Sequence, residues 1–135
     1  MKVWAIINDL QIPWHDQPVV QLVTDFITKD LKPHGIIING DGADAYELSE
    51  FTKDPLKNWT LDRERRDAAL LMAQFKGLKE RWWLGGNHED RLRRRLWKNP
   101  EFGKLRDLEF PQLFRLPDHG FQWKPYGGVL HLGKL

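Results

Sequence analysis

Residues 36–44, IIINGDGAD, join a short apolar run to a glycine-rich turn that carries two aspartates. The run from Ile36 to Ile38 is continuously apolar, which is typical of a strand that is covered on both faces of a parallel sheet. Gly40 and Gly42 allow the backbone to turn sharply after the run. The stretch therefore predicts a buried strand that ends in a polar turn holding Asp41 and Asp44.

Two other parts of the chain repeat this layout. The run 3–7 leads into Asn8-Asp9, and the run 82–84 leads into Gly85-Gly86-Asn87-His88. Segments with helical period separate the runs, so this order favours parallel strands joined by right-handed crossovers. Ligands of such sheets collect beyond the carboxyl ends of the strands, where all three polar turns are expected. The sequence thus predicts an α/β fold with its functional groups at that edge.

The segments between the runs have the signatures of helices. A first helix is expected to begin near Pro18 and to end at Pro33, and its apolar residues recur at the spacing of one helix face: Val19, Leu22, Val23, Phe26, Ile27 and Leu31. A second helix should begin after Thr60, a good N-cap, with a buried face of Leu61, Ala68, Leu71, Met72, Phe75 and Leu78. A short helical piece at 44–51, a third helix at 88–97 and two strands within 121–135 complete the expected elements.

Composition excludes several classes of function. A chain of 135 residues with 41% apolar residues and seven tryptophans suits one packed domain or a piece of one. The absence of cysteine excludes disulfides, thiolate metal sites and cysteine nucleophiles. With 21 basic and 19 acidic residues, net charge indicates no particular partner. The apolar run at the start is too short to span a membrane, so we expect a soluble, cytoplasmic protein without a membrane partner.

Three oxygen donors are expected to converge at the carboxyl edge of the sheet: Asp9, Asp41 and Asn87. Hard oxygen ligands with some imidazole suit Mn²⁺, Mg²⁺, Fe or Zn²⁺. Two such cations, roughly 3.5–4 Å apart, can activate a water and hold both ends of an in-line displacement at phosphorus. A carboxylate between two cations is the natural bridge, and Asp41 in its tight turn is the candidate.

Three motifs in this order resemble the signature of the calcineurin-like metallophosphoesterases. They are Asp-x-Gln at 9–11, Gly-Asp-x-x-Asp at 40–44 and Gly-Asn-His-Glu at 86–89. The stretches NGDGADAYELSEFTKDP and WWLGGNHEDRL are similar to the bacteriophage and prophage branch. The resemblance covers the chain from residue 2 to about residue 99. It implies the N-terminal half of an α/β/β/α metallophosphoesterase sandwich, with mostly parallel central strands and βαβ crossovers.

The resemblance also implies a set of metal ligands. Asp9 would bind the first metal with Gln11 beside it, Asp41 would bridge the two metals, and Asn87 would bind the second. The implied cofactors are two divalent cations, Mn²⁺ in first place and Mg²⁺, Fe or Zn²⁺ as the alternatives.

Two further residues are the implied catalytic pair. His88 would protonate the leaving oxygen or stabilise the charged phosphoryl group, and Asp44 would hydrogen-bond His88 and fix its tautomer. The implied activity is the hydrolysis of phosphate mono- or diesters by a metal-activated water. By analogy with the phage branch, the phosphoester substrate would be a nucleotide or a nucleic acid.

The chain departs from the family pattern at three places. Gln11 stands where the family usually has a histidine, and its amide oxygen would bind a metal more weakly. Ala45 stands where many members have an arginine, so one phosphate clamp is missing. The two later histidine motifs of the family have no counterpart in the chain. We therefore expect residues 1–135 to form a single, incomplete domain of uncertain activity, with an exposed flank through which it self-associates.

Each of these residues also has a plainer interpretation. Aspartate and glycine dominate ordinary turns, His88 would suit the opening of a helix, and Gln11 would suit a polar loop. A stripe of basic residues on the third helix would contact nucleic-acid phosphates or simply face solvent: Arg91, Arg94, Arg95 and Lys98. The alternative function is a catalytically incomplete phosphate- or nucleic-acid-binding module of the same fold.

Overall fold

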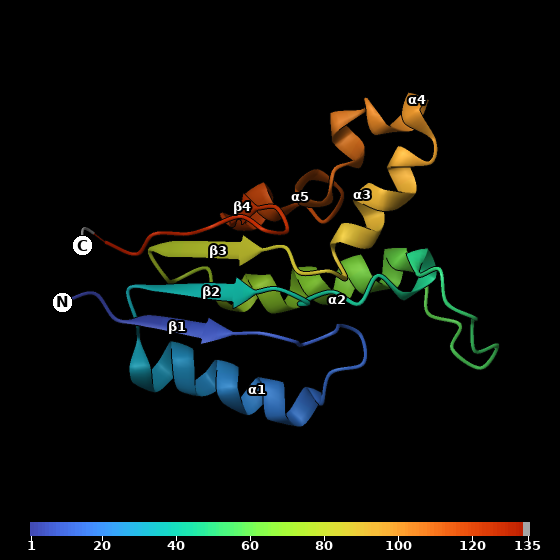
Figure 1. The fold of residues 1–135 in the computed structure, drawn as a ribbon. Helices are drawn as coiled ribbons and strands as arrows, with labels where there is room; N and C mark the ends of the chain where they lie inside the picture. Colours follow the sequence, from blue (N-terminus) through green and yellow to red (C-terminus); the bar gives the residue numbers. More distant parts are fainter. Residues whose placement is uncertain (134–135) are drawn as a thin grey trace.

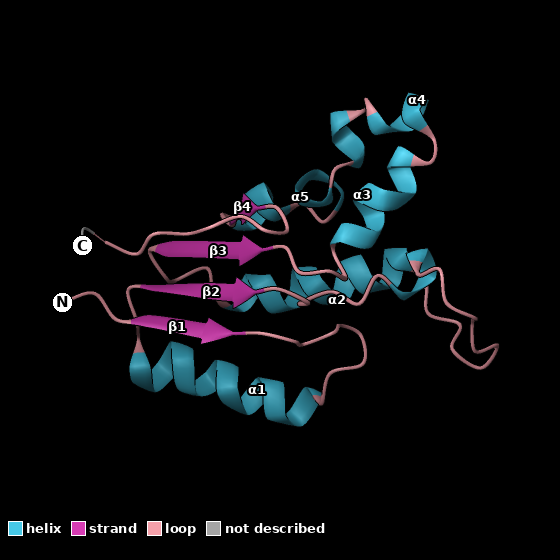
Figure 2. Cartoon of the chain, in the orientation of Figure 1, coloured by secondary structure: helices cyan, strands magenta, loops and turns pink. Residues whose placement is uncertain are grey.

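The structure, a computed structural model, describes residues 1–133. Strands and helices alternate along the chain: β1 is followed by α1, β2 by α2 and β3 by α3 (Figures 1 and 2). Two short helices, α4 (Pro100–Gly103) and α5 (Phe110–Leu113), come before the last strand, β4. This order is that of an α/β protein, which confirms the fold class expected from the sequence.

The four strands form one parallel sheet in the order β1-β2-β3-β4. Their bounds are β1 (Trp4–Ile7), β2 (Gly35–Asn39), β3 (Glu80–Leu84) and β4 (Gln122–Lys124). In the register of the sheet, Ile6 lies opposite Ile37, and Ile37 lies opposite Trp82. Because parallel strands point the same way, the loops that follow β1, β2 and β3 leave from the same edge.

The longer helices begin at the capping residues that the sequence provides. The Asp16 carboxylate accepts a hydrogen bond of 3.1 Å from the Val19 amide at the start of α1 (Gln17–Asp25), which continues as the π-helix η1 (Phe26–Leu31). The Thr60 hydroxyl accepts one of 3.3 Å from the Arg63 amide at the start of α2 (Leu61–Gln74). The remaining helical elements are α3 (Asp90–Trp97) and the 3-10 turns η2 (Tyr46–Leu48), η3 (Arg106–Leu108) and η4 (Leu116–His119).

The core lies between one face of the sheet and the helices behind it. In the orientation of Figure 1, α2 lies behind β2 and β3. Ala68 and Met72 of this helix and Phe75, its C-terminal capping residue, are buried, as expected. They belong to one apolar cluster with residues of the strands and of the segment 110–121: Ala5, Ile36, Ile38, Trp83, Phe110, Phe114, Leu116 and Phe121. This packing holds the carboxyl ends of β2 and β3 firmly in place.

Helix α1 turns most of its apolar residues to solvent. An apolar helix face normally packs inward, yet Leu22 is 70% exposed and Phe26 is 54% exposed. The buried residues of this helical segment are Thr24 and Ile27, with Val20 packed against the core. The molecule therefore carries an apolar stripe along the outside of α1.

The tail differs from the expectation of two strands. Only β4 forms, and residues 125–133 run as turns and irregular chain after it. The last two residues of the expected second strand lie outside the described part of the chain. Within residues 1–133, no helix combines the length and the apolar character needed to cross a membrane.

Candidate functional site

The loops after β1 and β2 run side by side beyond the ends of their strands. The amide of Asp9 donates to the Gly40 carbonyl at 3.1 Å, and the amide of Gln11 donates to the Asp41 carbonyl at 2.9 Å. Further along, the Asp44 amide donates to the Ile12 carbonyl at 2.9 Å. Hydrogen bonding of the parallel type thus continues past the sheet, and it brings the first two predicted motifs together.

Four residues of these loops adopt the left-handed region that non-glycine residues rarely occupy. The φ angles are 54° at Asp9 and 50° at Gln11, Asp41 and Ala45. A non-glycine residue in this region carries backbone strain, and such strain persists where the surrounding structure enforces it. Three of the four residues are predicted metal ligands. The strain therefore concentrates where the sequence placed the site.

The loop after β3 closes against the loop after β2. The amide of His88 donates to Asp41 Oδ1 at 3.0 Å, so the third motif touches the second directly. Gly86 makes this approach possible, because a Cβ atom at that position would lie 2.1 Å from Asp41 Oδ1. Asp41 therefore sits at the junction of the three loops, next to Asn87 and His88 in one direction and Gln11 in the other.

The side chain of Glu89 hydrogen-bonds to the loops that follow β2 and β3. Its carboxylate is 2% exposed and accepts five hydrogen bonds. Oε1 accepts from the amides of Gly42 (2.9 Å) and Ala43 (3.1 Å) and from Trp83 Nε1 (3.0 Å). Oε2 accepts from the amides of Asp41 (3.0 Å) and Gly86 (2.8 Å). One buried carboxylate thus satisfies the backbone donors of two loops, which would be costly to bury unpaired.

His88 and Asp44 lie in contact, as the resemblance implied. His88 Nδ1 is 2.7 Å from Asp44 Oδ1, although the contact lacks the angles of a hydrogen bond. The other oxygen, Asp44 Oδ2, accepts from Trp14 Nε1 at 3.0 Å. Asp44 is 6% exposed. It is therefore a buried carboxylate in contact with the imidazole.

Arg91 completes this group from the first turn of α3. Its Nη1 donates to the Asp44 carbonyl at 2.6 Å, and its Nη2 lies 3.1 Å from His88 Nε2. Since a guanidinium only donates, this contact makes His88 Nε2 an acceptor and places the imidazole proton on Nδ1. The arrangement joins a cation, an imidazole and a carboxylate in one hydrogen-bonded group beside Asp41.

The sequence interpretation placed neither Glu89, Arg91 nor Trp14 among the residues of this site. Glu89 was part of a matched motif, yet its five hydrogen bonds depend on the backbone geometry of two distant loops. Arg91 was placed in a basic stripe, and only the inward path of its side chain separates it from Arg94 and Arg95. For Arg91 a usable signal was present: it follows His88 by three residues, which is one helical turn.

The donor set at the junction suits a hard divalent cation. Asp41 Oδ1 already accepts the His88 amide, and Asp9 Oδ2 accepts the Asn8 side-chain amide, which leaves one oxygen of each carboxylate for a ligand. Asp9 and Asn87 are exposed. Carboxylate and amide oxygens are the ligands that Mg²⁺, Ca²⁺ and Mn²⁺ prefer. Within residues 1–133, no group of three or more His, Cys, Asp or Glu side chains is arranged to hold a metal ion. A cation here would therefore need the amide oxygens of Gln11 and Asn87 as well.

Helix α2 adds a buried acid under the same loops. The Ala45 amide donates to the Glu64 carboxyl group, which is 2% exposed. Burial raises the pKa of Glu64 from 4.5 to about 8; the hydrogen bond from Ala45 acts in the opposite direction, and the charges of Asp44 and Glu89 add to the rise. Glu64 is therefore largely protonated at neutral pH, and it ties α2 to the strained turn at Ala45.

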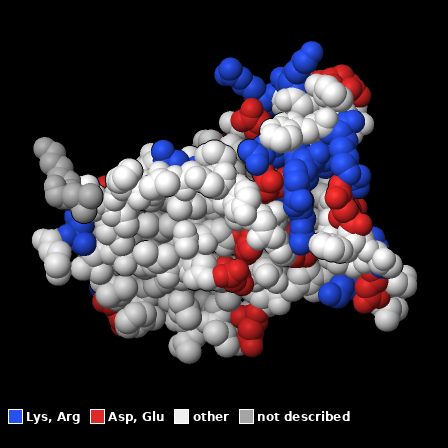
Figure 3. Space-filling model, viewed as in Figure 1, with Lys and Arg blue, Asp and Glu red and all other residues white. Residues whose placement is uncertain are grey.

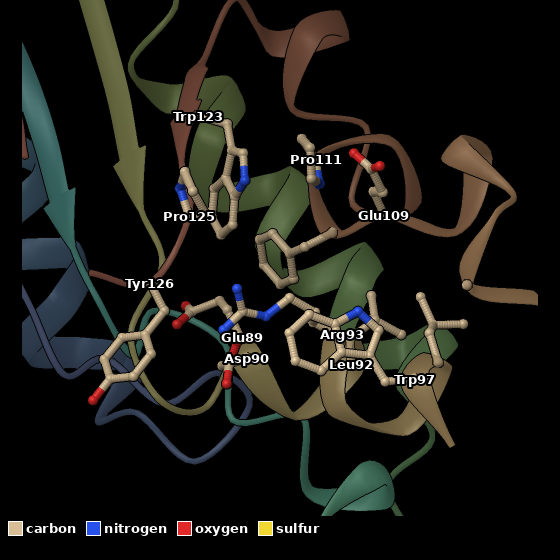
Figure 4. A pocket seen from close by; sticks show the side chains of 13 residues that line it. Glu89, Asp90, Leu92, Arg93, Trp97, Glu109, Pro111, Trp123, Pro125 and Tyr126 are labelled. Carbon is tan, nitrogen blue, oxygen red and sulfur yellow. Dashed lines mark ion pairs between the residues drawn. The ribbon is translucent and has the colours of Figure 1, made fainter. Parts of the chain in front are cut away.

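A separate cavity of about 370 Å³ lies on the far side of the loop after β3, between α3, α5 and β4 (Figure 4). Its walls are mainly apolar and include Leu92, Phe110 and Trp123. The acid at its rim, Asp90, is paired with Arg93 at 2.6 Å. None of the predicted site residues lines this cavity, and Glu89 is the residue that it shares with the junction of the three loops.

Comparisons of the chain with models of protein families, with curated proteins and with solved structures found no match.

Proposed function

We propose that this chain is a metal-dependent phosphoesterase that hydrolyses phosphate mono- or diesters at the junction of the three loops. We further propose that its sheet and helices correspond to the N-terminal half of a metallophosphoesterase sandwich. The observation that carries the proposal is the strained backbone at Asp9, Gln11 and Asp41, immediately beside the group formed by His88, Asp44 and Arg91. Oxygen donors and a general acid in adjacent positions are what hydrolysis at phosphorus requires.

The metal ligands in this proposal are Asp9, Gln11, Asp41 and Asn87, with Asp41 between the two cations. When bound, the cations would supply Lewis acidity toward the phosphoryl group and toward water. Asp41 is suited to the central position because the loops on both of its sides are fixed by hydrogen bonds. The two acids at the junction would otherwise face each other without a neutralising charge.

His88 would deliver a proton to the leaving oxygen, and Asp44 would hold its ring in position. Arg91 occupies His88 Nε2 in the substrate-free arrangement. When the guanidinium shifts its hydrogen bond to a phosphoryl oxygen, where it would stabilise the developing charge, Nε2 would be free to take up a proton from solvent. The resulting imidazolium, with its Nδ1–H facing Asp44, would pass the Nε2 proton to the leaving oxygen. Arg91 would then contact the phosphoryl group in place of the arginine that many family members have at the position of Ala45.

The decisive experiment measures Mn²⁺-dependent hydrolysis of p-nitrophenyl phosphate and of bis(p-nitrophenyl) phosphate. Asp41→Asn should abolish the Mn²⁺-dependent rate, whereas Asp62→Asn, on an exposed part of α2, should leave it unchanged. Mn²⁺ calorimetry on the same samples should show weak and incomplete occupancy of the two cation positions, since only two carboxylates and two amide oxygens are at hand. A rate that is indifferent to Asp41→Asn would refute the proposal.

The second candidate is the non-catalytic binding module, and the basic face of α3 is the observation that favours it. Absence of both hydrolysis and Mn²⁺ binding in wild-type protein, together with retained binding of a phosphate-bearing ligand, would select this alternative.

A further inference from the structure

A second concave surface lies next to the proposed active site. It is a groove of about 170 Å³ between α3 and the segment 48–51. Arg91, Arg94 and Arg95 line it from α3, and Ser49, Glu50 and Phe51 line it from the opposite wall. Figure 3 shows lysine and arginine atoms gathered over α3, in a molecule whose net charge is only +2. The positive charge is therefore concentrated here.

The electrostatic environment of the groove is positive in spite of Glu50. The pKa of Lys53 is lowered, first by burial and then by the neighbouring charges of Arg91 and Arg95. Lys98 pairs with Glu50 and lowers its pKa, with smaller contributions from Arg94 and Arg95. Within residues 1–133, Arg95 forms no ion pair with an acidic side chain. Arg94 Nε lies 3.5 Å from Asp90 Oδ2, whereas the charge of Arg95 is available to an anion.

Two arginines of the groove also contact residues of the proposed active site. Arg91 contacts His88 at one end of it, and Arg94 Nη2 lies 3.5 Å from the Asn87 carbonyl. From Arg91 to Lys98 the helix rises about 10 Å at 1.5 Å per residue. A chain of phosphates that starts at His88 would therefore meet several cations in succession along α3.

An exposed aromatic ring lies on the wall opposite the arginines. Phe51 is 79% exposed although it lines the groove. An aromatic side chain beside a row of cations is the combination with which proteins bind single-stranded nucleic acids, because a base stacks on the ring while the phosphates contact the cations. A small polyphosphate would use the arginines and leave the ring without a partner.

We propose that this groove binds a single-stranded nucleic acid, with phosphates on Arg94 and Arg95 and a base on Phe51, and that such a strand is the substrate presented to His88. The role as substrate rests on the proposed phosphoesterase function. The binding itself does not, because it involves none of the metal ligands.

The test measures binding of a fluorescent 12-nucleotide single strand by anisotropy, in a chelator and over a range of salt concentrations. The double variant Arg94→Ala/Arg95→Ala should bind more weakly, and its slope of log affinity against log salt should fall in magnitude by about 1.4, or about 0.7 for each lost phosphate contact. Phe51→Ala should weaken binding on the order of tenfold with an unchanged slope, since stacking releases no counterions.

Matched controls lie elsewhere on the surface. Arg66→Ala removes an exposed arginine of α2, and Phe102→Ala removes an exposed ring of α4; both variants should bind as the wild type does. Arg95→Ala alone, with an expected slope change of about 0.7, replaces the double variant if that one is poorly folded. Three results would each overturn the inference. They are a salt slope that is unchanged in the arginine variants, competition by pyrophosphate as strong as that by an unlabelled single strand, and binding that is unaffected by Phe51→Ala.

The two proposals fail in different ways. Strand binding without any Mn²⁺-dependent hydrolysis would remove the phosphoesterase function and leave the groove assignment in place. Hydrolysis of small esters without strand binding would remove the groove assignment and leave the phosphoesterase function in place.

Discussion

Glu89 is the residue on which the three loops depend most directly. Both of its oxygens are used, and both accept only N–H groups. In Glu89→Gln, one oxygen becomes an NH₂ group that would face two or three donors. We expect this variant to lose about 2–4 kcal/mol of unfolding free energy in urea titrations, the cost of leaving buried donors unpaired. Glu101→Gln, on exposed α4, serves as the control, and a similar small change in both variants would contradict the structural role of Glu89.

His88 tests the catalytic assignment at the same scale. If it acts as the general acid, His88→Ala should lower turnover by about 10²–10⁴-fold and leave the bound metal unchanged. His34→Gln, at the opposite edge of the sheet, is the matched histidine control. Metal content would be followed by elemental analysis of the purified variants. A parallel loss of metal and turnover would make His88 a ligand instead.

Among the elements, α2 carries a pH-dependent contribution to stability. Glu64 has a folded pKa of about 8 against a usual value of 4.5, so the folded protein binds more protons than the unfolded chain between these values. The contribution is therefore complete below pH 4.5 and is lost as the pH rises through 8, at about 1.4 kcal/mol per pH unit in between. Glu64→Gln should remove this slope.

The measurement is urea unfolding at several pH values from 5 to 8.5 on wild type and Glu64→Gln. The difference between the two free energies isolates the one carboxyl group, and Asp62→Asn controls for an exposed acid of the same helix. A difference that does not change with pH would show that Glu64 is solvated in the folded protein.

Strands β1, β2 and β3 and the second helix could be predicted from the sequence, because each has a clear pattern of apolar residues with recognisable boundaries. Continuous runs favour a buried strand, which holds for Ile36 to Ile38 of β2, although Ile6 in the similar run of β1 is exposed. Thr60 marks the start of α2. Helix α1 was different, since periodicity shows that residues share a face without showing what covers it. Thr24 and Ile27 pack inward there. The loop geometry around Glu89 was beyond prediction because it arises from contacts between residues about 45 positions apart.

For the whole molecule, the apolar surfaces predict association. The face of the sheet opposite α2 bears few charged atoms in Figure 3, and Ile6 on β1 is 56% exposed. The stripe on α1 adds Leu22 and Phe26 nearby. Contiguous apolar surface of this kind commonly marks a contact with another protein. We therefore expect the purified chain to self-associate.

Analytical ultracentrifugation over a concentration series would measure this association. The double variant Leu22→Glu/Phe26→Glu should shift the protein toward monomer, whereas Leu56→Glu, in an exposed loop, should leave the distribution unchanged. A wild-type protein that sediments as a monomer at every concentration would rule out self-association through α1.

The left-handed backbone at Asp9, Gln11 and Asp41 determines which substitutions would stabilise the fold at these positions. Glycine and asparagine occupy that region at lower cost than glutamine does. A descendant released from selection for the site would therefore gain stability by acquiring glycine or asparagine at these positions. Selection for the oxygen donors is the force that would keep the costlier residues in place, so relatives that keep the fold and carry glycine there are expected to have lost the chemistry.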